Sequence, residues 1–116
     1  MKKSILISFL FTLFIIGCTN AQKKITPDEA KNNIGKKVKV VGKVEQVYHS
    51  DKVVKLDIGG IYPDNPFTAV IYTADTAAFP NIDAYQGKEV EVTGTVQEYK
   101  DKPEIVMKDA DQLKLK

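Results

Sequence analysis

Arginine is absent from the sequence, and cysteine and histidine occur once each, as Cys18 and His49. Proteins that bind nucleic acid tightly usually carry an excess of basic residues and favour arginine for contacts with phosphates and bases. The absence of arginine therefore argues against tight nucleic-acid binding. A single cysteine excludes an internal disulfide, so the fold depends on its apolar core and its hydrogen bonds.

The single histidine cannot supply a catalytic triad or a metal site. His49 is followed by Ser50 and Asp51, but adjacent residues cannot point into one catalytic geometry, because triads are assembled from separated segments. A metal ion would need further ligands, and the aspartates lack the spacing of a calcium loop. The sequence shows no glycine-rich phosphate loop, nucleophile elbow or pair of catalytic carboxylates. We therefore expect no catalytic residue, no metal and no cofactor, and interpret His49 as an ordinary loop residue.

The charged residues are nearly balanced, with 17 lysines against 15 acidic residues. Two of these lysines, Lys2 and Lys3, precede an apolar run over residues 5–16. This run is too short to span a bilayer as a stable helix and is typical of an export signal, so we predict a signal peptide over residues 1–17. The mature chain would be formally neutral, because removal of two lysines leaves 15 of each sign.

The predicted signal ends in Gly17-Cys18, which resembles the lipobox of bacterial lipoproteins. The Cys18 thiol would be lipidated, and the small residue Gly17 before it would fit the pocket of the signal peptidase. The alternative is ordinary secretion with cleavage after Ala21. We expect residues 18–25 to form a polar tether. In Gram-negative bacteria the residue after the lipidated cysteine influences sorting, and Thr19 in place of Asp favours the outer membrane. The protein would then face the periplasm. The alternative is a soluble periplasmic or secreted protein.

A pattern of glycine, lysine and alternating valines occurs twice, over residues 35–48 and again 52 positions later over residues 87–99. Alternation with β-branched residues predicts two strands. Gly42 and Gly94 stand where each inward row would otherwise continue, and we expect them to let the strands bend around a small barrel. The alternation slips near Glu45-Gln46, which predicts a β-bulge.

The remaining segments complete an all-β domain over residues 26–116. Thr26, Pro27 and Glu29 predict a short helix over residues 27–33, because they fit the cap, the first turn and a capping box. Residues 73–85 predict one or two helical turns. The five predicted strands cover residues 37–49, 53–58, 67–72, 88–98 and 103–108, with a short terminal strand at Leu113 and Leu115. This order predicts a five-stranded oligonucleotide/oligosaccharide-binding barrel, the OB-fold, with a helix between its third and fourth strands.

The sequence also resembles a bacterial, exported OB-fold family described as nucleic-acid-binding-like. The resemblance rests on residues 56–60 (LDIGG), residues 62–71 (YPDNPFTAVI), Phe79, Gly87 and residues 99–108, and it covers nearly all of the predicted mature chain. It implies the OB-fold and single-stranded nucleic acid as ligand. A bacterial periplasmic OB-fold family linked to small ligands has the same size and export signal.

OB-folds bind ligands across their second and third strands, between the loops that join strands one to two and four to five. Lysines there would contact phosphates, and tyrosines would stack on bases. We predict five ligand-binding residues: Lys43, Lys55, Tyr62, Tyr72 and Lys100. The same surface would also hold Tyr48, Lys52 and Lys102, together with the acidic residues Glu45, Asp57 and Glu104, which would repel phosphate.

Each of these side chains also has a purely structural interpretation. Lysines commonly occupy solvated strand faces, and tyrosines cover barrel ends with their hydroxyl groups in water. Tyr62 and the two prolines that follow it would lock the loop between the second and third strands. Three functions therefore remain open: a non-catalytic, monomeric module that binds single-stranded nucleic acid, an envelope adaptor that binds a protein, a glycan or a small ligand, or an accessory domain of a separately encoded nuclease.

Overall fold

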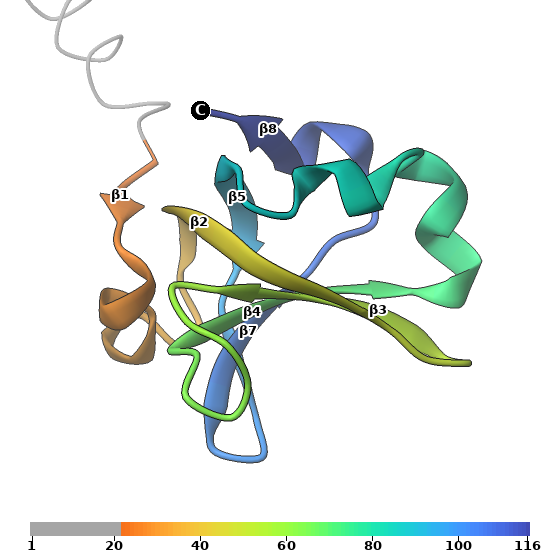
Figure 1. The fold of residues 1–116 in the computed structure, drawn as a ribbon. Coiled ribbons are helices and arrows are strands. Elements are labelled where there is room, and N and C mark those ends of the chain that lie inside the picture. The colour runs from red at the N-terminus through yellow and green to blue at the C-terminus, as the bar shows by residue number, and fades with distance from the viewer. Residues whose placement is uncertain (1–21) are drawn as a thin grey trace, which may run out of the picture.

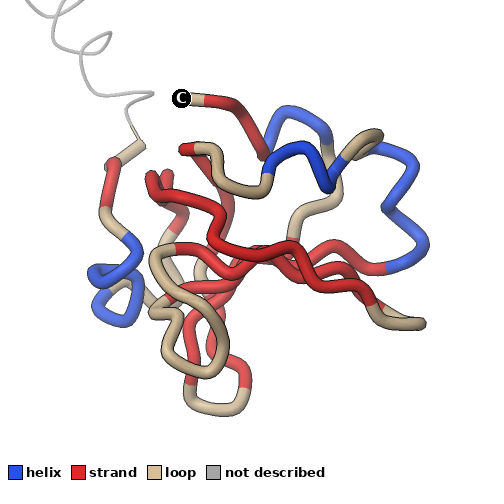
Figure 2. Tube along the Cα trace, viewed as in Figure 1, coloured by secondary structure: helices blue, strands red, loops and turns tan. Residues whose placement is uncertain are grey.

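The computed structural model describes residues 22–116, and the predicted signal peptide and Cys18 lie outside this part of the chain. The described residues are mostly β, with short 3-10 helices between the strands (Figures 1 and 2). In chain order the elements are β1 (Lys24–Ile25), η1 (Pro27–Asn32), β2 (Lys37–His49), β3 (Val53–Ile58), β4 (Phe67–Tyr72), η2 (Thr73–Ala78), η3 (Ile82–Tyr85), β5 (Glu89–Thr95), β6 (Gln97–Tyr99), β7 (Lys102–Val106), η4 (Ala110–Gln112) and β8 (Leu113–Leu115). Within residues 22–116 no helix is long and apolar enough to cross a membrane.

The strands form one sheet in the order β6-β7-β4-β3-β2-β5-β8, with β1 alongside β2. The long strand β2 changes partner along its length, pairing with β5 through Lys43 and with β3 from Val44 onward. The register shifts between Val44 and Gln46, where the sequence predicts a bulge. The bulge increases the local twist of β2, so that one strand serves both halves of the curved sheet.

Gly42 and Gly94 make room for neighbouring side chains. The pairing of β2 with β5 runs through both glycines without a register shift. A Cβ atom on Gly42 would lie 2.6 Å from Cγ of Pro27 and 2.8 Å from Cγ2 of Ile58, and one on Gly94 would lie 2.6 Å from Cγ2 of Ile105. Both glycines of the repeat therefore lie where core side chains pack closely against the backbone.

The predicted closed barrel of five strands is corrected in two respects. The described residues form eight strands, and the hydrogen-bonded path is open, beginning at β6 and ending at β8. The predicted fourth strand is divided into β5 and β6 at Val96, whose N–H and C=O pair with Lys36 and Gly35 before β2. After Val96 the chain turns away and pairs with β7 instead. The result is an OB-like, partly open sheet in which β2, β3, β4, β7 and β6 are neighbours.

Lys24 and Ile25, which the sequence places in the tether, form β1 in parallel with β2. Ile25 is 3% exposed and packs in the core. The core is otherwise formed mainly by valine and isoleucine from the inner faces of the strands, with Phe67, Phe79 and Met107. Because these side chains hold the strands in register, the outer-face residues occupy fixed positions.

Candidate ligand groove

The outer face of the sheet carries a groove of about 580 Å³. Its walls come from β2, β3, β4, β6 and β7 and from the loops over residues 59–66 and 100–101. These loops lie at the same end of the molecule in Figure 1. The groove is lined by Gln46, Tyr48, Lys55, Asp57, Tyr62, Pro63, Thr68, Tyr99, Lys100, Lys102, Pro103 and Glu104. The groove covers the strand face across which an OB-fold binds its ligand. Of the two loops predicted to flank the ligand, only the one over residues 100–101 borders it, whereas the β2–β3 loop with Lys52 does not line it.

A transverse row of five polar side chains crosses the sheet, and four of them lie on the floor of this groove: Gln46, Asp57, Thr68 and Glu104. Four successive pairings align its members: Gln46 with Asp57, Asp57 with Thr68, Thr68 with Glu104, and Glu104 with Gln97. Residues paired in this way point to the same face of a sheet. We call these five residues the polar row.

The two carboxylates of the polar row are buried. Asp57 is 4% exposed and Glu104 is 7% exposed. Oδ2 of Asp57 accepts a hydrogen bond from the N–H of Tyr62 at 3.2 Å, and Oε2 of Glu104 accepts one from the side-chain amide of Gln97 at 2.7 Å. Burial raises the pKa of Asp57, although the Tyr62 hydrogen bond and the charges of Lys102 and Lys55 act in the opposite direction.

Three exposed tyrosines surround the groove. Tyr62 is 71% exposed, Tyr99 is 51% exposed and Tyr48 is 50% exposed. The ammonium groups of Lys55 and Lys100 lie 6.0 Å and 5.4 Å from the centroid of the Tyr99 ring. An exposed aromatic ring beside cationic groups is the arrangement that holds a flat ring with a neighbouring anion.

The loop over residues 59–66 is fixed by Lys102. Its ammonium donates to the carbonyl of Pro63, to the carbonyl of Asn65 at 3.1 Å and to Oδ1 of Asn65 at 3.2 Å. The same ammonium lies 5.5 Å from the centroid of the Tyr62 ring. Because an ammonium has three donors, Lys102 is engaged in holding the loop, whereas Lys55 and Lys100 remain the cationic groups at the rim.

Lys100 is held in an uncommon backbone conformation. Lys100 and Asp101 have φ of 49° and 66° and form the two-residue turn between β6 and β7. Two positive φ values match the right-handed twist of a hairpin, but glycine or asparagine is favoured there. A lysine in this region is less stable than glycine by of order 1 kcal/mol. The turn places Lys100 at the rim of the groove.

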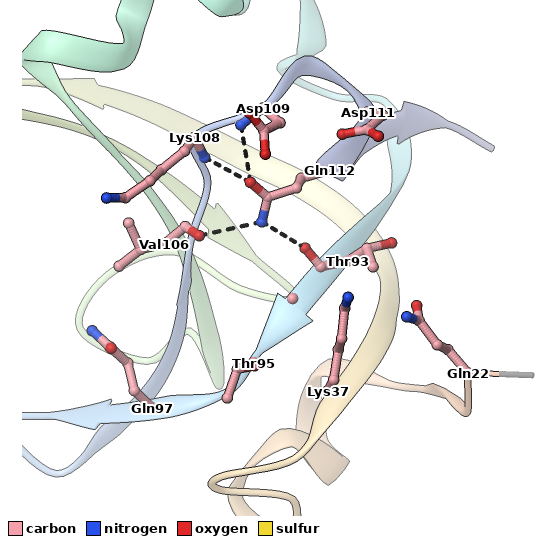
Figure 3. A pocket seen from close by; sticks show the side chains of 11 residues that line it. Gln22, Lys37, Thr93, Thr95, Gln97, Val106, Lys108, Asp109, Asp111 and Gln112 are labelled. Carbon is pink, nitrogen blue, oxygen red and sulfur yellow. Dashed lines mark hydrogen bonds between the residues drawn. The ribbon is translucent and has the colours of Figure 1, made fainter. Parts of the chain in front are cut away.

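A second hollow, of about 640 Å³, lies at the seam between β5 and β7 (Figure 3). Gln112 is one of the residues that line it (Figure 3). Its Oε1 accepts from the N–H groups of Lys108 at 2.7 Å and Asp109 at 3.0 Å, and its Nε2 donates to the carbonyls of Thr93 at 2.9 Å and Val106 at 3.4 Å. The Gln112 side chain thus links β5 and β7, which do not pair with each other in the sheet. We therefore interpret this hollow as a structural feature of the β5–β7 junction.

The structure brings three of the five predicted ligand residues together: Lys55, Tyr62 and Lys100 line the groove. Lys43 and Tyr72 are not among its lining residues. Lys43 pairs with Glu89 in the half of β2 that faces β5, and Tyr72 ends β4 opposite Val53. The sequence also missed Tyr99, because the predicted fourth strand ends at residue 98, whereas the structure continues the chain through Tyr99 as β6, paired with β7.

The histidine is engaged at the edge of the sheet. Nε2 of His49 lies 2.6 Å from Oδ1 of Asp83 in η3, and both side chains are exposed. This contact ties the end of β2 to the helical segment between β4 and β5. Among residues 22–116 no group of three or more His, Cys, Asp or Glu side chains could hold a metal ion.

No protein-family model matches the sequence, and no curated protein matches it. Among solved structures, the chain is similar to a protein described as a "putative aspartyl-tRNA synthetase" from Leishmania major Friedlin, with a TM-score of 0.57 and 15% sequence identity. The match covers 84% of this chain and 22% of that chain. This chain therefore corresponds to about a fifth of the length of that protein, and at this identity the likeness concerns the fold alone.

Proposed function

We propose that the protein is a non-catalytic OB-fold module that binds short single-stranded nucleic acid in the groove. The observation that carries this proposal is the clustering of three exposed tyrosines around one groove, with Lys55 and Lys100 at its rim. Stacking on an aromatic side chain is worth about 1–3 kcal/mol per base and tolerates any base. The cationic rim supplies the complementary charge for the sugar-phosphate backbone.

The charges set the orientation of the ligand. Asp57 and Glu104 are buried in the floor, and a phosphate there would be repelled by both. Lys55 and Lys100 lie beside the Tyr99 ring, where a phosphate linked to a base stacked on that ring can reach them. The bases therefore face the sheet, and the phosphates follow the rim.

Two further observations support the proposal. The sequence resembles an exported OB-fold family whose implied ligand is single-stranded nucleic acid. The structurally similar protein has a name that refers to tRNA, "putative aspartyl-tRNA synthetase". The balanced charge of the predicted mature chain and its lack of arginine point to modest affinity rather than tight binding.

Fluorescence anisotropy with labelled oligonucleotides, in low salt and at micromolar protein, tests this function. Two phosphate contacts predict that log K falls with log salt with a slope of about −1.4. Lys55→Ala should reduce the size of this slope by about 0.7. Lys43→Ala removes the same charge outside the groove and is the matched control. The proposal is wrong if no oligonucleotide binds, or if the two variants weaken binding equally.

We also propose that the protein is exported to the bacterial cell envelope and anchored by a lipid on Cys18. The support is the sequence alone: the apolar run over residues 5–16 followed by Gly17-Cys18. Cells expressing the full chain and fed a clickable fatty acid should label the wild type but not Cys18→Ser. Labelling of both proteins, or of neither, would contradict lipidation and favour ordinary secretion or retention.

A specific observation favours a second candidate function, the binding of a glycan or a small cationic molecule. Asp57 and Glu104 give the groove two buried acceptors, and aromatic rings beside carboxylates also suit sugars and ammonium groups. A thermal-shift screen with glycans and polyamines distinguishes the two functions. A raised Tm with these compounds, together with no response to oligonucleotides, would favour the second.

A further inference from the structure

We propose that the polar row makes the groove prefer bases that present an exocyclic amino group, so that cytosine binds more tightly than uracil. This inference rests on the proposed function and adds a base preference to it. The inference follows from the positions of Asp57 and Glu104 in the groove and from which of their oxygens already accept hydrogen bonds.

Both carboxylates line the groove, and each has one oxygen that accepts a hydrogen bond from the protein and one that does not. Oδ2 of Asp57 accepts from the N–H of Tyr62, and Oε2 of Glu104 accepts from Gln97. Within the described part of the chain, Oδ1 of Asp57 and Oε1 of Glu104 accept no hydrogen bond. Neither oxygen is completely buried, because no completely buried side-chain oxygen in residues 22–116 lacks a hydrogen-bond partner. Both are therefore acceptors that a ligand in the groove can reach.

The other polar side chains on the floor of the groove do not favour either base, so the carboxylates determine which base is preferred. Thr68 lies between Asp57 and Glu104 in the polar row. Its hydroxyl already accepts from the amide of Asn65 at 2.8 Å and keeps one donor. The amide of Gln46 offers both a donor and an acceptor. These two groups serve either kind of base edge, whereas an ionised carboxylate can only accept.

Lys55 and Lys102 are each two positions from one carboxylate of the polar row, Asp57 and Glu104 respectively, and Lys102 is not free to reverse the preference. Its ammonium is held by Pro63 and by both oxygens of Asn65. The ammonium of Lys55 lies beside the Tyr99 ring. Lys102 could donate to a carbonyl on a base only by giving up these hydrogen bonds, and the proposed function assigns Lys55 to the phosphate.

Cytosine and uracil differ in the group that would meet the carboxylates on the floor of the groove. Cytosine presents the N4 amino group, a donor, where uracil presents the O4 carbonyl, an acceptor. A donor can satisfy the free oxygen of a buried carboxylate, but a carbonyl placed against it leaves two acceptors facing each other with water removed. Both rings stack on tyrosine to a similar extent, so the difference reflects the floor of the groove.

The test compares (dC) and (dU) oligomers of one length, about six nucleotides, by anisotropy at pH 7.5 and low salt. We expect (dC) to bind about tenfold more tightly, which is in the range of one good base contact. Asp57→Asn and Glu104→Gln keep the shape but add a donor, and each should bring the ratio towards one. Glu89→Gln alters an exposed carboxylate on β5, away from the groove, and should leave the ratio unchanged.

The outcomes separate this inference from the function on which it rests. Binding of both oligomers with equal affinity, or tighter binding of (dU), would overturn the base preference and leave nucleic-acid binding intact. A preference for (dC) that survives in Asp57→Asn and in Glu104→Gln would overturn its assignment to the polar row. Failure of the wild type to bind either oligomer would overturn the function and the preference together.

Discussion

The ammonium of Lys55 lies 6.0 Å from the centre of the Tyr99 ring, although β4 and β7 separate their strands in the sheet. The curvature of the sheet brings the two side chains together across the groove. Lys100 approaches the same ring at 5.4 Å. One exposed aromatic ring is thereby close to two cations, which makes Tyr99 the residue on which the proposed function depends most.

Tyr99→Ala should weaken oligonucleotide binding by about 1–3 kcal/mol, because it removes a stacking surface. Tyr72→Ala is the matched control: Tyr72 is also exposed, at 45%, but does not line the groove. Anisotropy titrations of the two variants measure the difference. An equal loss in both would mean that the stacking surface extends beyond the groove, and no loss in Tyr99→Ala would remove the ring from the site.

Lys100→Gly should make the protein more stable and a weaker binder. Glycine adopts a positive φ without the steric cost that lysine has, so relief at φ 49° should raise the free energy of unfolding by about 0.5–1 kcal/mol. The same change removes a cation from the rim. Urea unfolding and anisotropy on one sample measure both effects. Improved stability without any loss of affinity would show that Lys100 does not contact the ligand.

Lys102→Met should loosen the loop over residues 59–66 while the sheet stays folded. Three acceptors on Pro63 and Asn65 lose their donor, at an expected cost of about 1–3 kcal/mol. Hydrogen exchange should accelerate at Tyr62 and its neighbours and remain slow in β3 and β4. Lys100→Met, at the adjacent turn, is the control. Unchanged exchange in the loop would show that Lys102 does not hold it.

The raised pKa of Asp57 predicts how stability depends on pH. Burial raises this pKa above its ordinary value of 3.8, so the folded chain binds the proton more tightly than the unfolded chain does. Stability should therefore fall as pH rises from about 3.8 through the raised pKa, and stay level above it. Urea unfolding of the wild type and Asp57→Asn, compared between about pH 3.5 and pH 7, isolates this contribution. A wild type that gains stability relative to the variant with rising pH would contradict the sign.

The alternating pattern was sufficient to predict the strands that are hydrophobic on one face. The limits of β3 and β4 agree with the prediction, and so do the bulge in β2 and the helical turns before β5. These features follow from local spacing, because a strand with one buried face must alternate. The short strand β1 was missed because two residues carry no pattern of their own.

The features that depend on contacts between distant segments could not be predicted. The alternation of residues 87–99 continues through Val96, and only its pairing with Gly35 and Lys36 divides the strand. Lys102 holds Asn65, which is 37 positions away, so nothing near it in the sequence shows that its ammonium is engaged. For the same reason Lys43 and Tyr72 resembled ligand residues, although the register places them outside the groove.

The most direct test of ligand binding in the groove is an NMR titration of the ¹⁵N-labelled protein with a short (dC) oligomer at low salt. We expect the amide signals of Lys55, Tyr99 and Glu104 to shift progressively, while those around Gln112 at the seam stay in place. Shifts that centre on Gln112, or a spectrum that does not change at millimolar oligomer, would contradict the assignment of the groove as a site for single-stranded nucleic acid.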